Sequence, residues 1–308
     1  GAPLAAWVGS FRARRDVDFR QQASMRPDER RPNRTQKRLE GWSLELTFEL
    51  VDDLAFAADR QLSVDGHLSN AEALHLGPCL EYMWLRRRRG LPSLRLAPRT
   101  PVLDCLREFV DAGAPVSSDL SVNIGRPIEV SRVPSDPESP YWMAFLRRVQ
   151  VAAHQSGYPT VLAAGLAGAV GEMASNAVEH SGRPETAVMA YHRSGAGFEF
   201  AIGDAGVGVR TSLSQCPDFQ GMSDSAEALA ACIQEGISRH GIGIGRGLGF
   251  TELFRSLANL DALVRFRSDD QALTMEGRGL GPLAGTPAER PRLQGFIVSV
   301  RASPLQIG

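Results

Sequence analysis

The sequence has little lysine, little cysteine and no long hydrophobic run, and each shortage excludes a class of protein. Of its 34 basic residues one, Lys37, is a lysine, which leaves no catalytic or phosphate-binding lysine for the folded part of the chain. The four cysteines form no Cys-x-x-Cys pair, so neither a zinc cluster nor a disulfide framework is indicated. The longest uncharged, mostly apolar run, 158–171, is shorter than the roughly 20 residues of a membrane span. A net charge of −1 does not favour nucleic-acid binding. We therefore expect a soluble, cytoplasmic protein with no nucleic-acid or membrane partner.

The length of 308 residues predicts about two domains. Residues 1–41 are basic, poor in apolar residues and without periodicity, which predicts a disordered tail. Residues 42–115 predict a small α/β domain, and residues 116–139, rich in Pro, Ser and Gly, predict a linker with one short strand. Residues 140–303 have the helix and strand patterns of a second α/β domain.

Local patterns predict where the elements lie. The alternation of Leu44, Leu46 and Phe48 with polar residues predicts a strand, and Gly77-Pro78 predicts a kink or break in the helical segment 70–89. Further along, the sequence predicts helices at 140–154, 160–180 and 248–257, and strands at 186–191, 198–202, 262–267, 271–275 and 295–301.

The first motif with chemical potential is GEMASNAVEHS, residues 171–181. Glu172 and Asn176 are four residues apart and project from one helix face, with His180 one turn further. An amide oxygen is a good ligand for Mg²⁺, and a carboxylate one turn earlier can accept a proton. Taken alone, this motif is also explained as the solvent-exposed face of an amphipathic helix.

The second motif is Asp204-Ala-Gly206-Val-Gly208, directly after the predicted strand 198–202. A carboxylate at a strand end can accept a hydrogen bond from an amino group such as adenine N6, and glycines beyond it allow close approach of a flat ring. An ordinary strand-to-loop turn is the alternative.

The third motif is GIGIGRGLGF, residues 241–250, ahead of a predicted helix. Its alternating glycines expose successive backbone N–H groups beside a helix N-terminus, which suits a polyphosphate. The chain has no GxxxxGK[ST] and no GxGxxG, so it is neither a P-loop nor a Rossmann protein, and it has no protein-kinase glycine loop.

In this order and spacing the three motifs resemble the GHKL (histidine kinase-like) ATPase superfamily over residues 141–303, and the first motif is most similar to that of the anti-sigma-factor serine kinases. The resemblance implies a Bergerat-type α/β sandwich, an α+β fold with a mixed sheet and helices on one face, and an ATP lid at 209–240. It also implies the cofactors ATP and Mg²⁺.

Carried over residue by residue, the resemblance gives each motif a role. Asn176 would coordinate Mg²⁺ on the triphosphate, Glu172 would be the catalytic general base, and Asp204 would bind adenine N6 beside Gly206 and Gly208. The glycine-rich nucleotide-binding residues are Gly243, Gly245, Arg246, Gly247, Leu248 and Gly249, with Arg246 as a charge partner of the phosphates. His180 either contacts the nucleotide or caps the helix end.

Two departures from the family limit the activity that we expect. His154 lacks the sequence context of a histidine-kinase phosphoacceptor, and we expect no second domain to donate a catalytic lysine. The prediction is a serine/threonine kinase or ATPase of a bacterial signalling partner switch. A non-catalytic, ATP-gated interaction module is the main alternative, and an α/β domain that binds no nucleotide is the other.

The first predicted domain has a fainter resemblance. The run from Leu68 to Gly113 is similar to the later half of a STAS domain, in which a helix, a strand and an amphipathic helix follow a phosphorylatable serine; Ser63 and Ser69 lie nearest that position. A generic α/β packing domain is the alternative. The resemblances imply a protein partner, as substrate or regulator, of the STAS-domain or sigma-factor-like kind.

Overall fold

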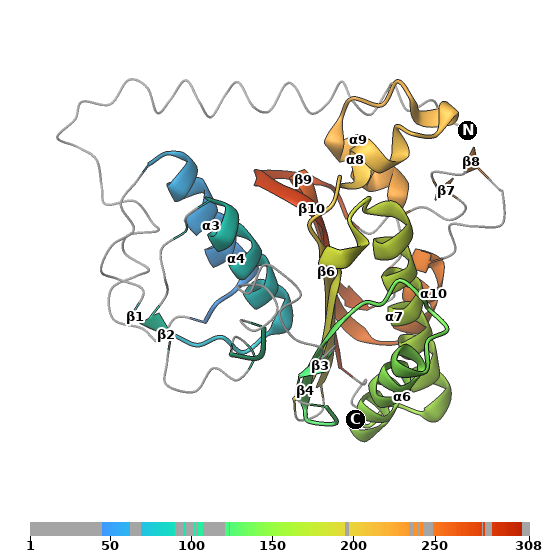
Figure 1. The fold of residues 1–308 in the computed structure, drawn as a ribbon. Coiled ribbons are helices and arrows are strands. Elements are labelled where there is room, and N and C mark those ends of the chain that lie inside the picture. Colours follow the sequence, from blue (N-terminus) through green and yellow to red (C-terminus); the bar gives the residue numbers. More distant parts are fainter. Residues whose placement is uncertain are drawn as a thin grey trace. The chain divides into compact units, whose positions relative to one another are not determined.

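The structure is a computed structural model. It describes residues 45–61, 69–89, 91, 95–96, 102, 104–106, 121–122, 124–194, 197–233, 237–238, 241–242, 249–278, 280 and 285–303. Contacts divide the chain into two units, 1–43 and 44–308. The predicted basic tail, 1–41, lies outside the described residues. The second unit has an α+β fold (Figure 1).

The described residues form a six-stranded sheet in the order β3-β4-β5-β6-β10-β9. Its strands are β3 (Ser121–Val122), β4 (Ile128–Arg132), β5 (Val188–Ser194), β6 (Gly197–Asp204), β9 (Asp261–Arg278) and β10 (Ala288–Ser303). All pairings within it are antiparallel, so the expected mixed sheet is wrong. Four pairs of consecutive strands lie side by side: β3–β4, β4–β5, β5–β6 and β9–β10. Few residues separate the two strands in three of these pairs, whereas α6 and α7 lie between β4 and β5 in the sequence.

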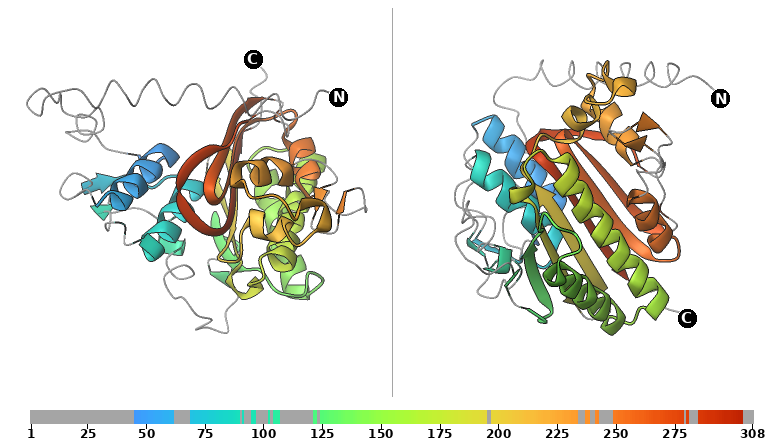
Figure 2. Two further views of the ribbon diagram at one scale, coloured as in Figure 1. Left: turned by 90° about the horizontal axis from the view of Figure 1, so that it is seen from above. Right: turned by 45° about the vertical axis from the view of Figure 1, so that its right-hand side comes forward.

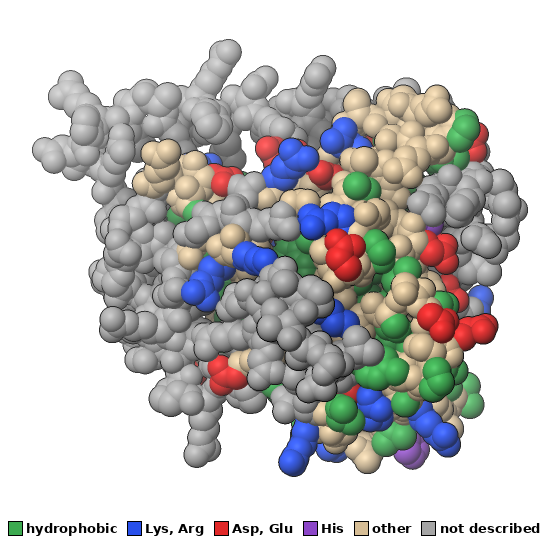
Figure 3. Space-filling view, viewed as in Figure 1, with side chains coloured by type: hydrophobic (Ala, Val, Ile, Leu, Met, Phe, Trp, Pro, Cys, Tyr) green, Lys and Arg blue, Asp and Glu red, His purple; other side chains and the backbone are tan. Residues whose placement is uncertain are grey.

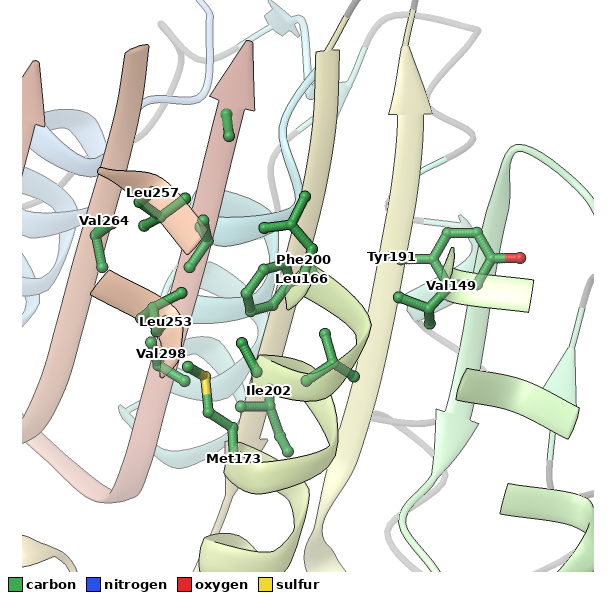
Figure 4. Packing of buried hydrophobic residues seen from close by; sticks show 14 of the residues in the cluster. Val149, Leu166, Met173, Tyr191, Phe200, Ile202, Leu253, Leu257, Val264 and Val298 are labelled. Atoms are coloured by element: carbon green, nitrogen blue, oxygen red, sulfur yellow. The ribbon is translucent and has the colours of Figure 1, made fainter. Parts of the chain in front are cut away.

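Three helices cover one face of this sheet: α6 (Pro140–Gln155), α7 (Thr160–His180) and α10 (Gly249–Leu257). Figure 2, on the right, shows α6 and α7 lying in front of one face of the sheet. In Figure 4, Met173 of α7 and Leu253 of α10 lie beside Val298 and Ile202 of the sheet. The predicted helices 140–154, 160–180 and 248–257 are confirmed to within one residue at each end, and the strands at 186–191 and 198–202 are confirmed to within three.

Helix α7 meets the length and hydropathy criteria for a membrane span, and among the described residues it is the one helix that does. Its side chains Leu166, Val170 and Met173 are buried in the hydrophobic core against the sheet. Packing against the sheet thus accounts for the buried part of α7, which is 44% of its apolar window.

The opposite face of the sheet is covered by two helices from the N-terminal part of the unit, α3 (Phe48–Asp59) and α4 (Leu76–Arg89). Arg265 of β9 joins them to the sheet: its Nε donates to both carboxylate oxygens of Glu81 at 3.1 Å, and its Nη2 donates to Asp52 at 2.8 Å. The segment 42–115, predicted as a separate domain, thus contributes helices to the same unit as the sheet.

Several predicted elements differ in the structure. The strand predicted from Leu44, Leu46 and Phe48 is wrong, because α3 begins at Phe48, where the Thr47 side chain accepts a hydrogen bond from the Leu50 N–H at 3.3 Å. Gly77-Pro78 causes no break, since α4 begins at Leu76 and proline is tolerated in a first turn. Strands β1 (Ser69–Ala71) and β2 (Arg95–Leu96) pair in parallel.

The predicted linker and the last strands also need correction. Residues 116–139 contain two strands, β3 and β4, at one edge of the sheet, rather than one. The strands predicted at 262–267 and 271–275 are one continuous strand, β9, in which Asp269 has a positive φ of 48° where the register with β10 shifts.

The predicted lid, 209–240, includes short elements. These are α8 (Val209–Leu213), the 3₁₀ turn η3 (Pro217–Phe219), α9 (Ser225–Cys232) and β7 (Ile237–Ser238), which pairs with β8 (Gly241–Ile242). Another 3₁₀ turn, η2 (Pro184–Thr186), joins α7 to β5.

Candidate functional site

The first motif lies on the last three turns of α7. Glu172 is exposed and Asn176 is half-buried, while the residue that follows each of them, Met173 and Ala177, is buried against the core. His180 is half-buried and ends the helix. The carboxylate and the amide therefore lie beside the apolar stripe of the helix and are open to a ligand.

The second motif packs directly against the end of that helix. A Cβ added at Gly206 would lie 2.0 Å from the backbone oxygen of Ser181, the residue after α7, so that only glycine fits there. The N–H of Val207 donates to the same Ser181 oxygen at 2.8 Å. The first and second motifs are thus joined at one place, the point where α7 ends and β6 ends.

Asp204 is the last residue of β6 and is 3% exposed. Its Oδ1 accepts a hydrogen bond from the Gly206 N–H at 2.9 Å. Burial raises the pKa of this carboxyl to about 7, against the opposing effect of backbone N–H donors from Gly206 and Phe296. A buried carboxyl that titrates near neutral pH can accept a hydrogen bond from a ligand amino group when it is ionised and donate one when it is protonated.

The turn η2 and the strands β9 and β10 hold the loop that follows Asp204. The Ala205 N–H donates to the Thr186 hydroxyl at 2.9 Å, and the Gln294 amide donates to the Ala205 carbonyl at 3.1 Å. The Ser268 hydroxyl accepts from the Val209 N–H and donates to the Gly295 carbonyl, both at 3.0 Å. These bonds fix the backbone of 205–209 from three separate segments of the chain.

Thr186, Ser268 and Gln294 were not expected as site residues. Each makes one hydrogen bond to the loop from another segment of the chain. The sequence around each of the three residues contains no recognisable motif. No signal in the sequence identifies them, because the contact exists only after the sheet has formed.

The third motif lies partly outside the described residues. Gly243, Gly245, Arg246, Gly247 and Leu248 fall there, so the structure does not test their predicted roles. Gly249 is the first residue of α10.

The start of α10 is anchored near Asp204. The ring of Phe250 packs edge-to-face on Phe296 of β10, with ring centroids 6.2 Å apart, and Phe296 is the register partner of Asp204. The anchor points of all three motifs therefore lie at the same end of the sheet: the Ser181 oxygen, the Asp204 strand end and the Phe250 ring.

Among the described residues, no group of three or more His, Cys, Asp or Glu side chains could hold a metal ion. A Mg²⁺ ion carried by a nucleotide needs no such cluster, because phosphate oxygens and water supply most of its ligands. A single amide oxygen, such as that of Asn176, is a sufficient protein ligand for this kind of ion.

Comparison with known proteins assigns no family to the chain. No protein-family model matches the chain, and the searches of curated proteins and of solved structures found no match.

Proposed function

We propose that this chain is an ATP-binding regulatory protein of the histidine kinase-like ATPase type, which acts in the cytoplasm as a serine/threonine kinase or ATPase of a bacterial signalling partner switch. The observation that carries the proposal is the contact of Gly206 with the Ser181 oxygen, which places a buried carboxyl at the end of the helix that bears Glu172 and Asn176. One nucleotide can be bound both through its adenine and through its Mg²⁺ only if the residues for the two lie close together.

The residues fit the parts of a Mg²⁺–ATP complex. The Asp204 carboxyl lies in a dry environment, where a hydrogen bond to an amino group is worth more than in water. Asn176 offers an amide oxygen to Mg²⁺, about one helical turn before the end of α7. The glycine-rich segment leads into the N-terminus of α10, an arrangement that favours phosphate.

The chemistry proposed for Glu172 is proton removal from the attacking hydroxyl group or water. Mg²⁺ would neutralise charge on the transferred phosphoryl group, and the N–H groups of 243–249 would bind its oxygens. The substrate hydroxyl belongs to a protein partner of the STAS-domain or sigma-factor-like kind.

Site occupancy is tested by titrating ATP into the wild type, Asp204→Asn and Asn176→Ala, with and without Mg²⁺, by calorimetry. Asp204→Asn weakens binding under both conditions, because it replaces a carboxylate acceptor of the adenine amino group. Asn176→Ala weakens binding only when Mg²⁺ is present. Asp261→Asn, an exposed position at the start of β9, is the control and binds as the wild type does. Equal affinity in all four proteins would overturn the proposal.

A second candidate function is an ATP-gated interaction module without turnover. It is favoured by the exposure of Glu172, for which no hydrogen bond or ion pair is found among the described residues, since a general base is normally oriented by a neighbouring group. In this alternative ATP orders the lid and changes a binding surface.

Single-turnover assays with γ-labelled ATP distinguish the two candidates. The catalytic proposal predicts released or transferred phosphate that Glu172→Gln reduces by about 100-fold or more. Glu179→Gln, the same substitution about two turns further along α7, retains the activity. Binding of ATP with no product in the wild type would favour the module.

A further inference from the structure

A second candidate binding site lies at the other end of the sheet. A cavity of about 400 Å³ is bounded by α6, the turn before β4, and β5. Its lining includes four arginines, Arg126, Arg147, Arg148 and Arg193. Figure 3 shows blue basic side chains beside green apolar ones at the lower end of the molecule, where Figure 1 has α6.

This cavity is separate from the proposed nucleotide site. Arg193 pairs in register with Phe198, near the start of β6, whereas Asp204 ends that strand. Six residues of extended chain span about 20 Å, so the two sites lie at opposite ends of β6.

One of the four arginines is committed to a buried carboxylate. Glu129 is fully buried and accepts two hydrogen bonds from Arg148 Nε, at 3.1 and 2.9 Å, and one from Nη2 at 2.7 Å. The Tyr191 hydroxyl at 2.9 Å and the Gly125 N–H at 3.1 Å complete the set of donors. The charge of Glu129 is thus balanced by Arg148, and the wall of the cavity is rigidly held.

The remaining three arginines have no such partner. Within the part of the chain that the structure describes, no carboxylate forms an ion pair with Arg126, Arg147 or Arg193. Three cations around one hollow repel one another, and an anion with several charges relieves that repulsion while its oxygens accept from the guanidinium groups.

We propose that the cavity binds a small organic anion with two or more negative charges, of the phosphomonoester or polycarboxylate kind. Its volume is within the range of small-molecule sites, about 300–1,000 Å³. Ala144 and Val151 of α6 supply an apolar side for the carbon part of such a ligand. The proposal does not depend on the nucleotide site.

The experiment titrates pyrophosphate and citrate separately into the full chain by calorimetry at constant ionic strength. Acetate serves as the singly charged probe. The wild type binds at least one of the two multivalent anions and does not bind acetate; preference for pyrophosphate identifies phosphate chemistry, and preference for citrate identifies carboxylate chemistry.

Two variants locate the binding. The double variant Arg147→Gln/Arg193→Gln lowers the affinity at least about tenfold, because it removes two charge-assisted contacts. Arg278→Gln, exposed on β9 at the other edge of the sheet, leaves it unchanged, and a thermal melt verifies that both variants fold. The double variant binds Mg²⁺–ATP as the wild type does, which separates this site from the proposed ATP site. No binding of either anion to the wild type, or equal binding by the double variant, would overturn the proposal.

Discussion

The two faces of the central sheet are covered in different ways. On one face α6, α7 and α10 bury aliphatic and aromatic side chains, among them Leu166, Met173 and Leu253. On the other face α3 and α4 are joined to β9 and β10 partly through a buried ion-pair network centred on Arg265. Apolar packing tolerates small adjustments, whereas a buried charge network depends on every partner being present.

The largest effect is expected from breaking the charged face. Arg265→Ala leaves Glu81 and Asp52 as buried carboxylates without their main partner, which lowers the free energy of unfolding by about 3–5 kcal/mol. Urea unfolding measures the loss. The matched control is Arg278→Ala, an exposed arginine of the same strand, which changes stability by less than about 0.5 kcal/mol. Equal stability of the two variants would show that the network contributes nothing to holding α3 and α4.

The apolar face is tested by Met173→Ala, which removes a side chain that is 2% exposed. We expect a loss of about 3 kcal/mol from lost burial and the cavity left behind. Val161→Ala, on the exposed side of the same helix, is the control, since Val161 is 86% exposed. A loss for Met173→Ala no larger than that of the control would contradict the assignment of α7 as a core helix.

Asp204, at the end of β6, should make the stability of the fold and the affinity for ATP change with pH in opposite directions. Burial raises the pKa of Asp204 in the folded chain to about 7, from an ordinary aspartate value of 3.8, so the folded chain holds more protons between those pH values and loses stability as pH rises across them. ATP binding instead strengthens as pH rises through about 7, because the ionised carboxylate is the acceptor for the adenine amino group. Chemical unfolding and ATP titration from pH 5 to 8 measure both trends.

Asp204→Asn removes both trends, whereas Asp261→Asn, an exposed control, keeps them. Trends that persist in Asp204→Asn belong to another group and would remove the basis for this assignment.

The smallest effect is expected at the loop after Asp204. Ser268→Ala deletes the hydroxyl that joins the Val209 N–H to the Gly295 carbonyl, at a cost of about 1 kcal/mol in stability and a several-fold loss of ATP affinity. Ser299→Ala on β10 is the control, because its buried hydroxyl has no hydrogen-bond partner among the described residues. If both variants bind ATP equally, Ser268 does not position the loop.

The contrast between the faces also shows what the sequence could predict. Helix α6 begins with a signal that the sequence itself contains: Ser139 is the cap, with its hydroxyl accepting from the Trp142 N–H at 3.4 Å, and Pro140 follows in the first turn. Helix α7 was predicted from its periodicity. Both signals depend on residues that are close together in the sequence, so they do not require knowledge of the tertiary contacts.

The charged face could not be predicted in this way. Arg265 meets Glu81 across 184 residues of sequence and Asp52 across 213, and no periodicity links such positions. The strand predicted at Leu44, Leu46 and Phe48 failed because the Thr47 cap starts a helix within the alternating pattern. The positions of Glu172, Asn176 and Asp204 along their elements agree with the motifs, while the hydroxyl of Ser268 was found only in the structure.

Hydrogen exchange with and without Mg²⁺–ATP, followed by mass spectrometry, tests most directly whether one nucleotide joins the end of α7, the end of β6 and the start of α10. We predict that ATP slows exchange together in peptides covering 176–182, 204–209 and 243–250, and that Asp204→Asn removes all three effects. Protection confined to one of these peptides, or located at α6 instead, would contradict the account.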